Sequence, residues 1–277
     1  MLSTLKFKFL KKTKNAWISN NIHEFTKQNI DLLFKNKIPY VIIKNFISNE
    51  KCDLLIDCAK KQGLDYYEDT FPRVGKIGVT QYEHSFSPKF PYFFKSCQEN
   101  LKRQNLVKAS KFDPVENIFS LFNEENMNLK VMTEKEYCDY YIGLYRIFEP
   151  GTYAPIHFDY APVDGKDWEI GKITQQLSYN IYLQIPKIGG ELFVYNMQWK
   201  KDKHDKFKLP KRIASYGFSE EMVKDAEFVK FIPKKGDLVL FNSQNFHEVK
   251  KGNDYRFSIS SFIGREKNDS KEIWMWN

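Results

Sequence analysis

The sequence predicts an α+β protein, with helices in the first half and an antiparallel β-sandwich or barrel in the second. Two observations carry this prediction. Before about residue 138, helix N-caps precede apolar residues at helical spacing. After it, short runs rich in β-branched and aromatic residues alternate with turn signals, which is typical of antiparallel sheets. The 277 residues, 42% of them hydrophobic, supply enough apolar side chains for one large core.

The first half begins with a short strand, predicted over residues 39–46. Ser48 then offers an N-cap to a helix that we expect to end near Gly63. The expected apolar face of this helix consists of Leu54, Leu55, Cys58 and Ala59. Residues 64–90 show no clear period and predict loops with short strands, and a further helix is expected over 90–107.

The next helix has the clearest start. Asp113 is a predicted N-cap, Pro114 suits the first helical position, and Glu116 completes a capping-box pattern. The apolar residues that follow at i, i+3, i+4 and i+7 are Val115, Ile118, Phe119 and Phe122. This spacing predicts an amphipathic helix that packs on the core.

The second half predicts strands separated by turns, with one long interruption. The expected strands are 139–149, 153–159, 176–186, 190–198, 227–233, 237–242, 246–250 and 255–263. The interruption, residues 200–226, holds seven Lys or Arg in its first thirteen positions and a helical run over 219–226. It is too long for a hairpin turn, so we expect a lid-like insertion at the edge of the sheet, with His204 solvated in its charged part.

Charge and cysteine usage bear on partners and compartment. The net charge is +8, but the lysines are spread along the chain without interleaved aromatics, so no nucleic-acid partner is expected. No run approaches the roughly 18 apolar residues of a membrane span, and residues 1–14 lack an apolar stretch of signal length. The four cysteines form no CxxC pair, which fits a reducing, cytoplasmic setting.

The residues that indicate chemistry lie in the β-rich half. His157 and Asp159 are separated by one residue in a predicted strand, so their side chains point to the same face. His247 follows the predicted strand GDLVLFN, and Arg256 comes nine residues later. Two histidines and one carboxylate form a facial triad, which leaves open positions on a non-haem Fe(II) ion. A guanidinium fork such as that of Arg256 matches the distal carboxylate of a 2-oxo acid, and Ser258 could add a hydroxyl.

This order of motifs, with Gly-Gly-Glu at 189–191 and Gly-Asp at 236–237 between them, resembles the Fe(II)/2-oxoglutarate-dependent oxygenases over roughly residues 140–264. The resemblance implies a double-stranded β-helix (jelly-roll, cupin-like) core over 138–277, with N-terminal helices packed on it. It also implies that residues 1–137 line a substrate pocket, and that the cofactors are Fe(II), 2-oxoglutarate and O2.

A closer resemblance is to the carrier-independent aliphatic halogenases that act on indole alkaloids of the welwitindolinone type. It rests on QLSYNIYLQIPKIGGELFVYNMQW (176–199), KNFISNEKCDLLIDCAKK (44–61) and the C-terminal IWMWN. Those halogenases carry Gly where this sequence has Asp159, and the missing carboxylate opens an iron position for chloride. The resemblance therefore implies the same scaffold with hydroxylation of a free small molecule, such as an amino acid, a nucleoside or an alkaloid.

The resemblance also assigns roles. It implies that His157, Asp159 and His247 hold the iron, and that Arg256, Ser258 and Tyr145 bind 2-oxoglutarate. The side chains expected to line the substrate pocket are Ile77, Val79, His84 and Tyr160.

Other functions remain open at this stage. A prolyl-type peptide hydroxylase would need an open groove, and a cupin-like metal-binding sensor would need no arginine after the distal histidine. Desaturation, epoxidation and ring formation share the same oxidative start as hydroxylation, so the choice depends on how the substrate is held. Oligomeric state is not readable from the sequence.

Overall fold

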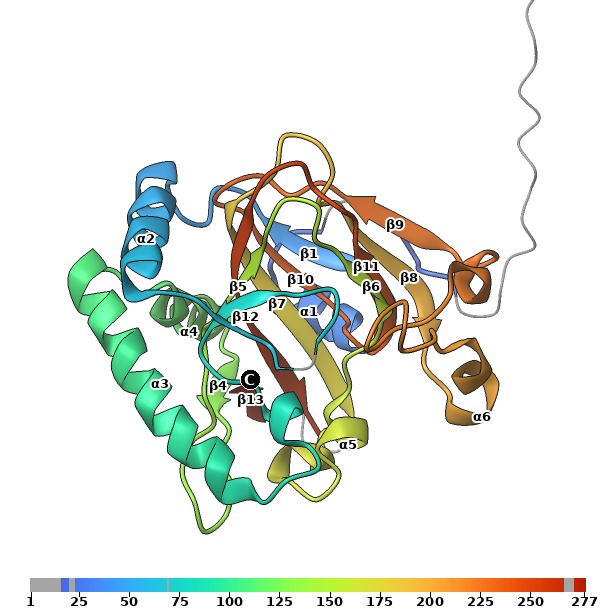
Figure 1. Ribbon diagram of the computed structural model, residues 1–277, viewed down its shortest axis with the longest axis horizontal. Helices are drawn as coiled ribbons and strands as arrows, with labels where there is room; N and C mark the ends of the chain where they lie inside the picture. Colours follow the sequence, from blue (N-terminus) through green and yellow to red (C-terminus); the bar gives the residue numbers. More distant parts are fainter. Residues whose placement is uncertain (1–15, 20–22, 69, 267–271) are drawn as a thin grey trace, which may run out of the picture.

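The computed structural model describes residues 16–19, 23–68, 70–266 and 272–277. Its centre is a pair of facing antiparallel sheets that form a jelly-roll (Figure 1). In the described residues the larger sheet has nine strands, with the order β1-β10-β7-β12-β5-β3-β2; β13 also pairs with β12, and β4 pairs with β13 in the one parallel ladder of the described sheets. These strands are β1 (Tyr40–Ile43), β2 (Asp65–Tyr66), β3 (Gly75–Ile77), β4 (Asn128–Val131), β5 (Leu144–Phe148), β7 (Gln175–Gln184), β10 (Leu238–Phe241), β12 (Arg256–Arg265) and β13 (Glu272–Trp276).

The smaller sheet has the order β6-β11-β8-β9. Its strands are β6 (Ala154–His157), β8 (Leu192–Gln198), β9 (Phe228–Phe231) and β11 (Asn245–Val249). Tight turns join the two sheets. At Gly236 the backbone has φ +87°, and a Cβ there would lie 2.4 Å from the carbonyl oxygen of Ile47, so only glycine fits this turn.

Four longer helices flank the larger sheet: α1 (Lys27–Phe34), α2 (Asn49–Gln62), α3 (Lys89–Ser110) and α4 (Pro114–Glu124), the last three gathered on one side in Figure 1. The short helical turns are η1 (Gln81–His84), α5 (Ala161–Asp164), η2 (Glu169–Lys172), α6 (Lys201–His204), η3 (Asp205–Phe207) and η4 (Glu220–Val223). No helix in the described ranges combines the length and apolar character needed to cross a bilayer.

Alternate side chains of β7 face the apolar core and the cavity. Leu177, Tyr179 and Ile181 belong to the main apolar cluster, together with buried side chains of the four long helices. Ser178 and Asn180, which alternate with them, line a cavity between the two sheets instead. Alternate residues of a strand face opposite sides, so one strand both anchors the helices and presents polar groups to the cavity.

The eight strands expected in the second half are confirmed, with ends shifted by a few residues. The expectation for His204 is wrong. Its side chain is 2% exposed, its Nδ1 accepts a hydrogen bond from the amide of Lys200, and its ring packs on the edge of Phe246. Leu54 is also misplaced by the prediction, because its side chain is 39% exposed while Leu55 is buried. Residues 1–14 lie outside the described residues.

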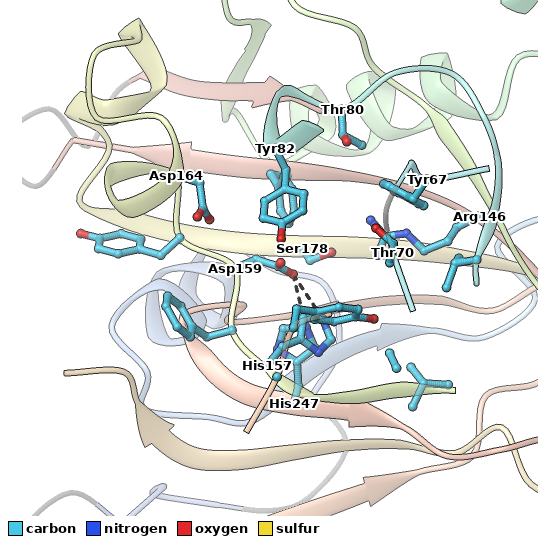
Figure 2. A pocket seen from close by; sticks show the side chains of 18 of the residues that line it. Tyr67, Thr70, Thr80, Tyr82, Arg146, His157, Asp159, Asp164, Ser178 and His247 are labelled. Atoms are coloured by element: carbon cyan, nitrogen blue, oxygen red, sulfur yellow. Dashed lines mark ion pairs between the residues drawn. The ribbon is translucent and has the colours of Figure 1, made fainter. Parts of the chain in front are cut away.

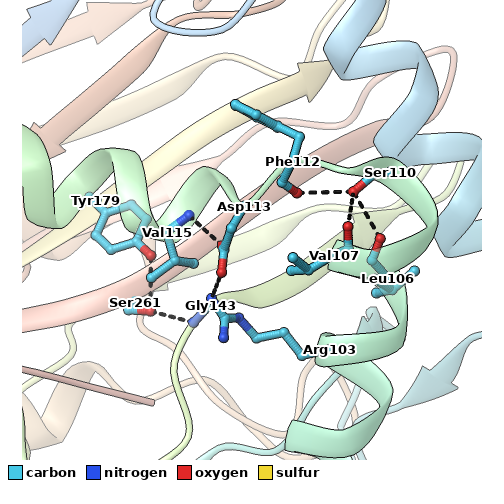
Figure 3. A network of polar contacts seen from close by, with 10 residues as sticks. All are labelled: Arg103, Leu106, Val107, Ser110, Phe112, Asp113, Val115, Gly143, Tyr179 and Ser261. Atoms are coloured by element: carbon cyan, nitrogen blue, oxygen red, sulfur yellow. Dashed lines mark hydrogen bonds and ion pairs between the residues drawn. The ribbon is translucent and has the colours of Figure 1, made fainter.

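The helix predicted from Asp113 begins as expected, through a small polar network (Figure 3). One carboxylate oxygen of Asp113 accepts from the amide of Val115 at 2.9 Å, and the other pairs with Arg103 at 2.6 Å. The capping box itself is not formed, because among the described contacts the Glu116 side chain makes no hydrogen bond back to Asp113. Asp113 thus satisfies a free helix amide and links α4 to α3.

Asp113→Ala should lower the free energy of unfolding by about 1–2 kcal/mol, since it removes an N-cap and a partly exposed ion pair. Urea unfolding followed by circular dichroism measures the change. The matched control is Glu116→Ala, which should stay within about 0.5 kcal/mol of the wild type because its side chain is exposed and unbonded. An equal loss in both variants would contradict the capping role.

Candidate active site

Three potential metal ligands converge on the inner face of the smaller sheet. His157 on β6 and His247 on β11 are direct cross-strand partners, with ring centroids 4.2 Å apart. The Oδ2 atom of Asp159 lies 3.3 Å from His247 Nε2 and 4.0 Å from His157 Nε2. One ligand atom from each residue falls within 4.8 Å of the others, so the three can share one ion.

The backbone fixes which imidazole nitrogen is free to bind. The Nδ1 atom of His157 lies 2.7 Å from the carbonyl oxygen of Pro155, and that of His247 lies 2.9 Å from the carbonyl of Asn245. A carbonyl only accepts, so both Nδ1 atoms carry the proton and both Nε2 atoms are left as ligands. Such outer hydrogen bonds hold a metal-binding histidine in one tautomer and orientation.

Asp159 is positioned by the loop after β6 rather than by the strand, which ends at His157. Its amide donates to the Ser243 carbonyl at 2.9 Å. Its own carbonyl accepts from Ser243 Oγ at 3.3 Å and from Gln176 Nε2 at 3.2 Å. The backbone of Asp159 is therefore tied to β7 and to the turn before β11, which aims its carboxylate at the two imidazoles.

The electrostatics favour a bound cation. Burial, and then the neighbouring His247, lower the pKa of His157 to about 4. Burial alone would raise the pKa of Asp159, but His247, His157 and Arg146 outweigh it and bring the pKa to about 2. Two Nε2 lone pairs and one carboxylate are the ligand types of a facial Fe(II) site, so the residues fit this ion.

The His157 imidazole should stay neutral in the metal-free protein until the pH falls to about 4. A histidine in an unfolded chain titrates near 6.5. Between these values the folded state binds fewer protons, so the His157 contribution to stability declines as the pH falls from about 6.5 toward 4. NMR titration of labelled histidine, with His157→Gln to assign the resonance, measures this pKa. Titration of His157 near pH 6.5 would contradict the buried geometry.

The three ligands open into a cavity of about 510 Å³ between the two sheets (Figure 2). Its apolar lining includes Val74, Phe148, Leu192, Phe241 and Val249. Its polar lining includes Arg146, Arg256, Asp164, Ser178 and Asn180. The cavity thus combines an apolar interior with a small number of charged groups, as small-molecule sites do.

Arg256 lines the cavity from β12 and has capacity to bind an anion. Its side chain contacts the rings of Phe148 and Tyr182, and Nη2 lies 3.4 Å from the Tyr182 hydroxyl. Among the described residues its Nε has no hydrogen-bond partner, and no carboxylate lies within 4.0 Å of it. An unsatisfied buried guanidinium is costly, and the distal carboxylate of 2-oxoglutarate is the group it fits.

The other two residues expected to bind the co-substrate lie elsewhere. Tyr145 does not line the cavity but belongs to the main apolar cluster, because on β5 it faces the helices while Arg146 faces the cavity. Ser258 is fully buried with an unpartnered Oγ among the described residues, and it is not part of the cavity lining either.

Only one of the four residues expected to line the substrate pocket does so. Tyr160 lines the cavity. Ile77 joins the main core, Val79 joins an aromatic cluster, and His84 packs against Tyr92 with ring centroids 5.7 Å apart, so none of these three lines the cavity. The stretch between Val79 and His84 does reach the cavity, but through Thr80, Gln81 and Tyr82.

Sequence reasoning missed several cavity residues. Arg146 could have been found from the period of two, because the apolar Tyr145 and Ile147 mark the core face of β5. Asp164, whose pKa burial and Asp159 raise to about 7, lies in the short helix after the triad loop. Tyr216 gives no local signal. It comes from the insertion 200–226 and meets the His157 ring edge-on, with centroids 5.5 Å apart.

Comparison with known proteins places this site in a family. The model of the carrier-protein-independent halogenase WelO5 family matches residues 15–277. Among curated proteins, leucinostatins biosynthesis cluster protein S of Purpureocillium lilacinum is 36% identical over 208 residues, 72% of this chain and 83% of that protein. The L-gamma-glutamyl-L-propargylglycine hydroxylase of Streptantibioticus cattleyicolor is 29% identical over 140 residues, 48% of each chain.

The jelly-roll is shared with solved structures. An N-substituted L-amino acid dioxygenase from Burkholderia ambifaria superposes with a TM-score of 0.64 over 90% of this chain and 91% of that one, at 14% identity. This likeness confirms the fold. The chain belongs to the carrier-protein-independent halogenase WelO5 family, and it is an iron oxygenase that uses Fe(II), 2-oxoglutarate and O2.

Proposed function

We propose that this protein hydroxylates an unactivated C–H bond of a free small molecule and converts 2-oxoglutarate to succinate and CO2. The observation that carries the proposal is Asp159, whose carboxylate lies within 4.8 Å of both histidine ligand atoms. With three protein ligands on an octahedral Fe(II), 2-oxoglutarate would take two of the remaining positions and O2 the last, so no position would be left for chloride. The relative that is a hydroxylase by name supports the same reaction type.

Each residue of the site has a distinct role in this reaction. His157, Asp159 and His247 hold Fe(II), which with 2-oxoglutarate and O2 supplies the oxidant for the C–H bond. Arg256 pairs with the distal carboxylate of 2-oxoglutarate and sets its orientation. The apolar lining and the insertion keep water from the reacting carbon, while the charged groups fix the substrate pose.

A free small molecule fits the cavity better than a peptide loop. Residues of the insertion, including Leu209, Tyr216 and Phe218, form part of the cavity wall, so the opening is bounded on that side. A wall on this side supports a small substrate more than a peptide, which would need an open groove. We propose that 200–226 acts as a lid over the bound substrate.

The test is a succinate-release screen with amino acids, N-acyl amino acids, nucleosides, indole alkaloids and proline-rich peptides, each with and without chloride. We expect succinate together with a small-molecule product that carries one added oxygen atom and no chlorine. A chlorinated product from the wild-type protein, or oxygen added only to peptides, would contradict the proposal.

A further inference from the structure

A second guanidinium in the cavity has no carboxylate partner. Arg146 projects from β5 into the cavity, and no carboxylate of the described residues lies within 4.0 Å of it. Outside the cavity, two arginines of low exposure in the described residues are paired: Arg103 with Asp113 at 2.6 Å and Arg265 with Asp31 at 2.5 Å. A buried cation is stable only when paired or hydrogen-bonded. Arg146 therefore has capacity for an anion that the chain itself does not provide.

The side chains around Arg146 come from loops that form part of the cavity wall. The Tyr67 hydroxyl, Asp159 and the Tyr216 hydroxyl lie close enough to act on the charge of Arg146. Figure 2 shows Tyr67 and Thr70 beside it, on the opposite side of Asp159 from Asp164. Tyr67 and Thr70 come from the loop between β2 and β3, and Tyr216 comes from the insertion, so segments outside the paired strands enclose this guanidinium.

The strand register separates Arg146 from Arg256. On β5 and β12, Phe148 pairs with Arg256, and Arg146 pairs with Ser258, one cavity-facing step along the same strand. Arg256 is enclosed by Phe148 and Tyr182. Two guanidinium groups at successive cavity-facing positions can hold two separate anions, because one bidentate fork would be enough for the distal carboxylate of 2-oxoglutarate.

The charge balance of the cavity also favours an anionic substrate. When bound, the two charges of Fe(II) would be offset by the two carboxylates of 2-oxoglutarate, and Asp159 would offset one guanidinium. Asp164 is the only other acid of the described lining, and burial raises its pKa to about 7. Lys208 and Lys211 add positive charge on the insertion side. With Asp164 only partly ionised near neutral pH, the lining keeps a net positive charge, which favours an anionic substrate.

We propose that the substrate carries a carboxylate and that Arg146 binds it, with the Tyr67 and Tyr216 hydroxyls as further partners. This inference rests on the proposed function and defines the substrate class as carboxylic acids. Arg146 is then a specificity-determining residue, and Arg256 alone holds the distal end of the co-substrate.

The test measures binding without turnover. Protein loaded with Mn(II) and 2-oxoglutarate is titrated by calorimetry with N-acetyl-L-leucine and 4-methylpentanoate, each against its carboxamide. We expect both acids to bind at least about tenfold more tightly than their amides, the difference expected for a hydrogen-bonded charge. Arg146→Gln should remove this preference and leave the Kd of 2-oxoglutarate within about threefold of the wild type.

The matched control is Arg73→Gln, which removes a positive charge from the same β2–β3 loop. Arg73 stacks on Tyr66, with its guanidinium 3.5 Å from the ring centroid, and does not line the cavity. The acid preference should survive in this variant. Arg146→Lys keeps the positive charge without the planar guanidinium and should retain part of the acid preference. This variant replaces Arg146→Gln in the test if the glutamine variant does not fold.

Three outcomes would overturn the proposal: equal binding of acids and amides to the wild type, an unchanged acid preference in Arg146→Gln, or a loss of 2-oxoglutarate affinity in that variant as large as the loss of acid affinity. The last would assign Arg146 to the co-substrate instead. Because the titration needs no reaction, a protein that binds acids through Arg146 but releases no succinate with any compound would contradict the proposed hydroxylation and leave this site intact.

Discussion

Asp159→Ala should reduce succinate-coupled hydroxylation by more than about 100-fold. Changes to groups that only orient a metal ligand already cost about 10–100-fold in affinity or activity, and this variant removes a ligand. The carboxylate is also the one anion among the three ligand side chains, so its loss leaves two neutral imidazoles to hold a dication. Iron content after anaerobic loading, together with product formation, measures the effect.

The matched control is Asp164→Ala, which removes the other cavity carboxylate without touching the triad. Asp164 is not one of the three residues whose ligand atoms cluster within 4.8 Å. Iron binding should therefore remain at the wild-type level in this variant. Asp159→Ala protein that retains full iron affinity and hydroxylation would show that the carboxylate is not a ligand.

Arg256→Gln should raise the 2-oxoglutarate concentration needed for half-maximal activity by about 100-fold, with a much smaller effect on iron binding. Truncating one partner of a buried, hydrogen-bonded charge pair costs about 2–5 kcal/mol, and 1.4 kcal/mol corresponds to tenfold. Tyr182 and Phe148 remain to shape the pocket, but neither offers a positive charge. Activity measured against 2-oxoglutarate concentration gives the shift.

Arg265→Gln provides the control from the opposite end of the same strand. Arg265 pairs with Asp31 of α1 at 2.5 Å and lies outside the cavity lining. This variant should lose stability and keep the wild-type requirement for 2-oxoglutarate. Equal losses of iron and 2-oxoglutarate affinity in Arg256→Gln would contradict the assignment of this arginine to the co-substrate.

The spacing of short motifs allowed the sequence to predict the centre of the site. His157 and Asp159 are neighbours in the chain, and His247 pairs with His157 because both lie on adjacent strands whose turn signals are readable. The caps at Ser48 and Asp113 are local features, so the helices they begin were predicted correctly. Local patterns suffice wherever the structure depends on hydrogen bonds between near neighbours.

The cavity wall was less predictable, because it joins segments that are distant in the chain. Tyr67 and Tyr216 approach Arg146 from two loops separated by about 150 residues, and neither loop has a periodic pattern. The strand that contains Tyr145 is predicted correctly, but the side chain faces the core and not the cavity. A shift of one residue exchanges core for cavity along every strand, so the side of the sheet must be known before a lining residue is assigned.

The most direct test of the metal site is anaerobic addition of Fe(II) and 2-oxoglutarate to the metal-free protein, followed by visible absorption. If His157, Asp159 and His247 hold one iron with open positions for the co-substrate, the wild type should develop the weak charge-transfer band of a chelated keto acid at one iron per chain, and His247→Ala should not. Iron bound at full stoichiometry without that band in the wild type, or an unchanged band in His247→Ala, would contradict the account.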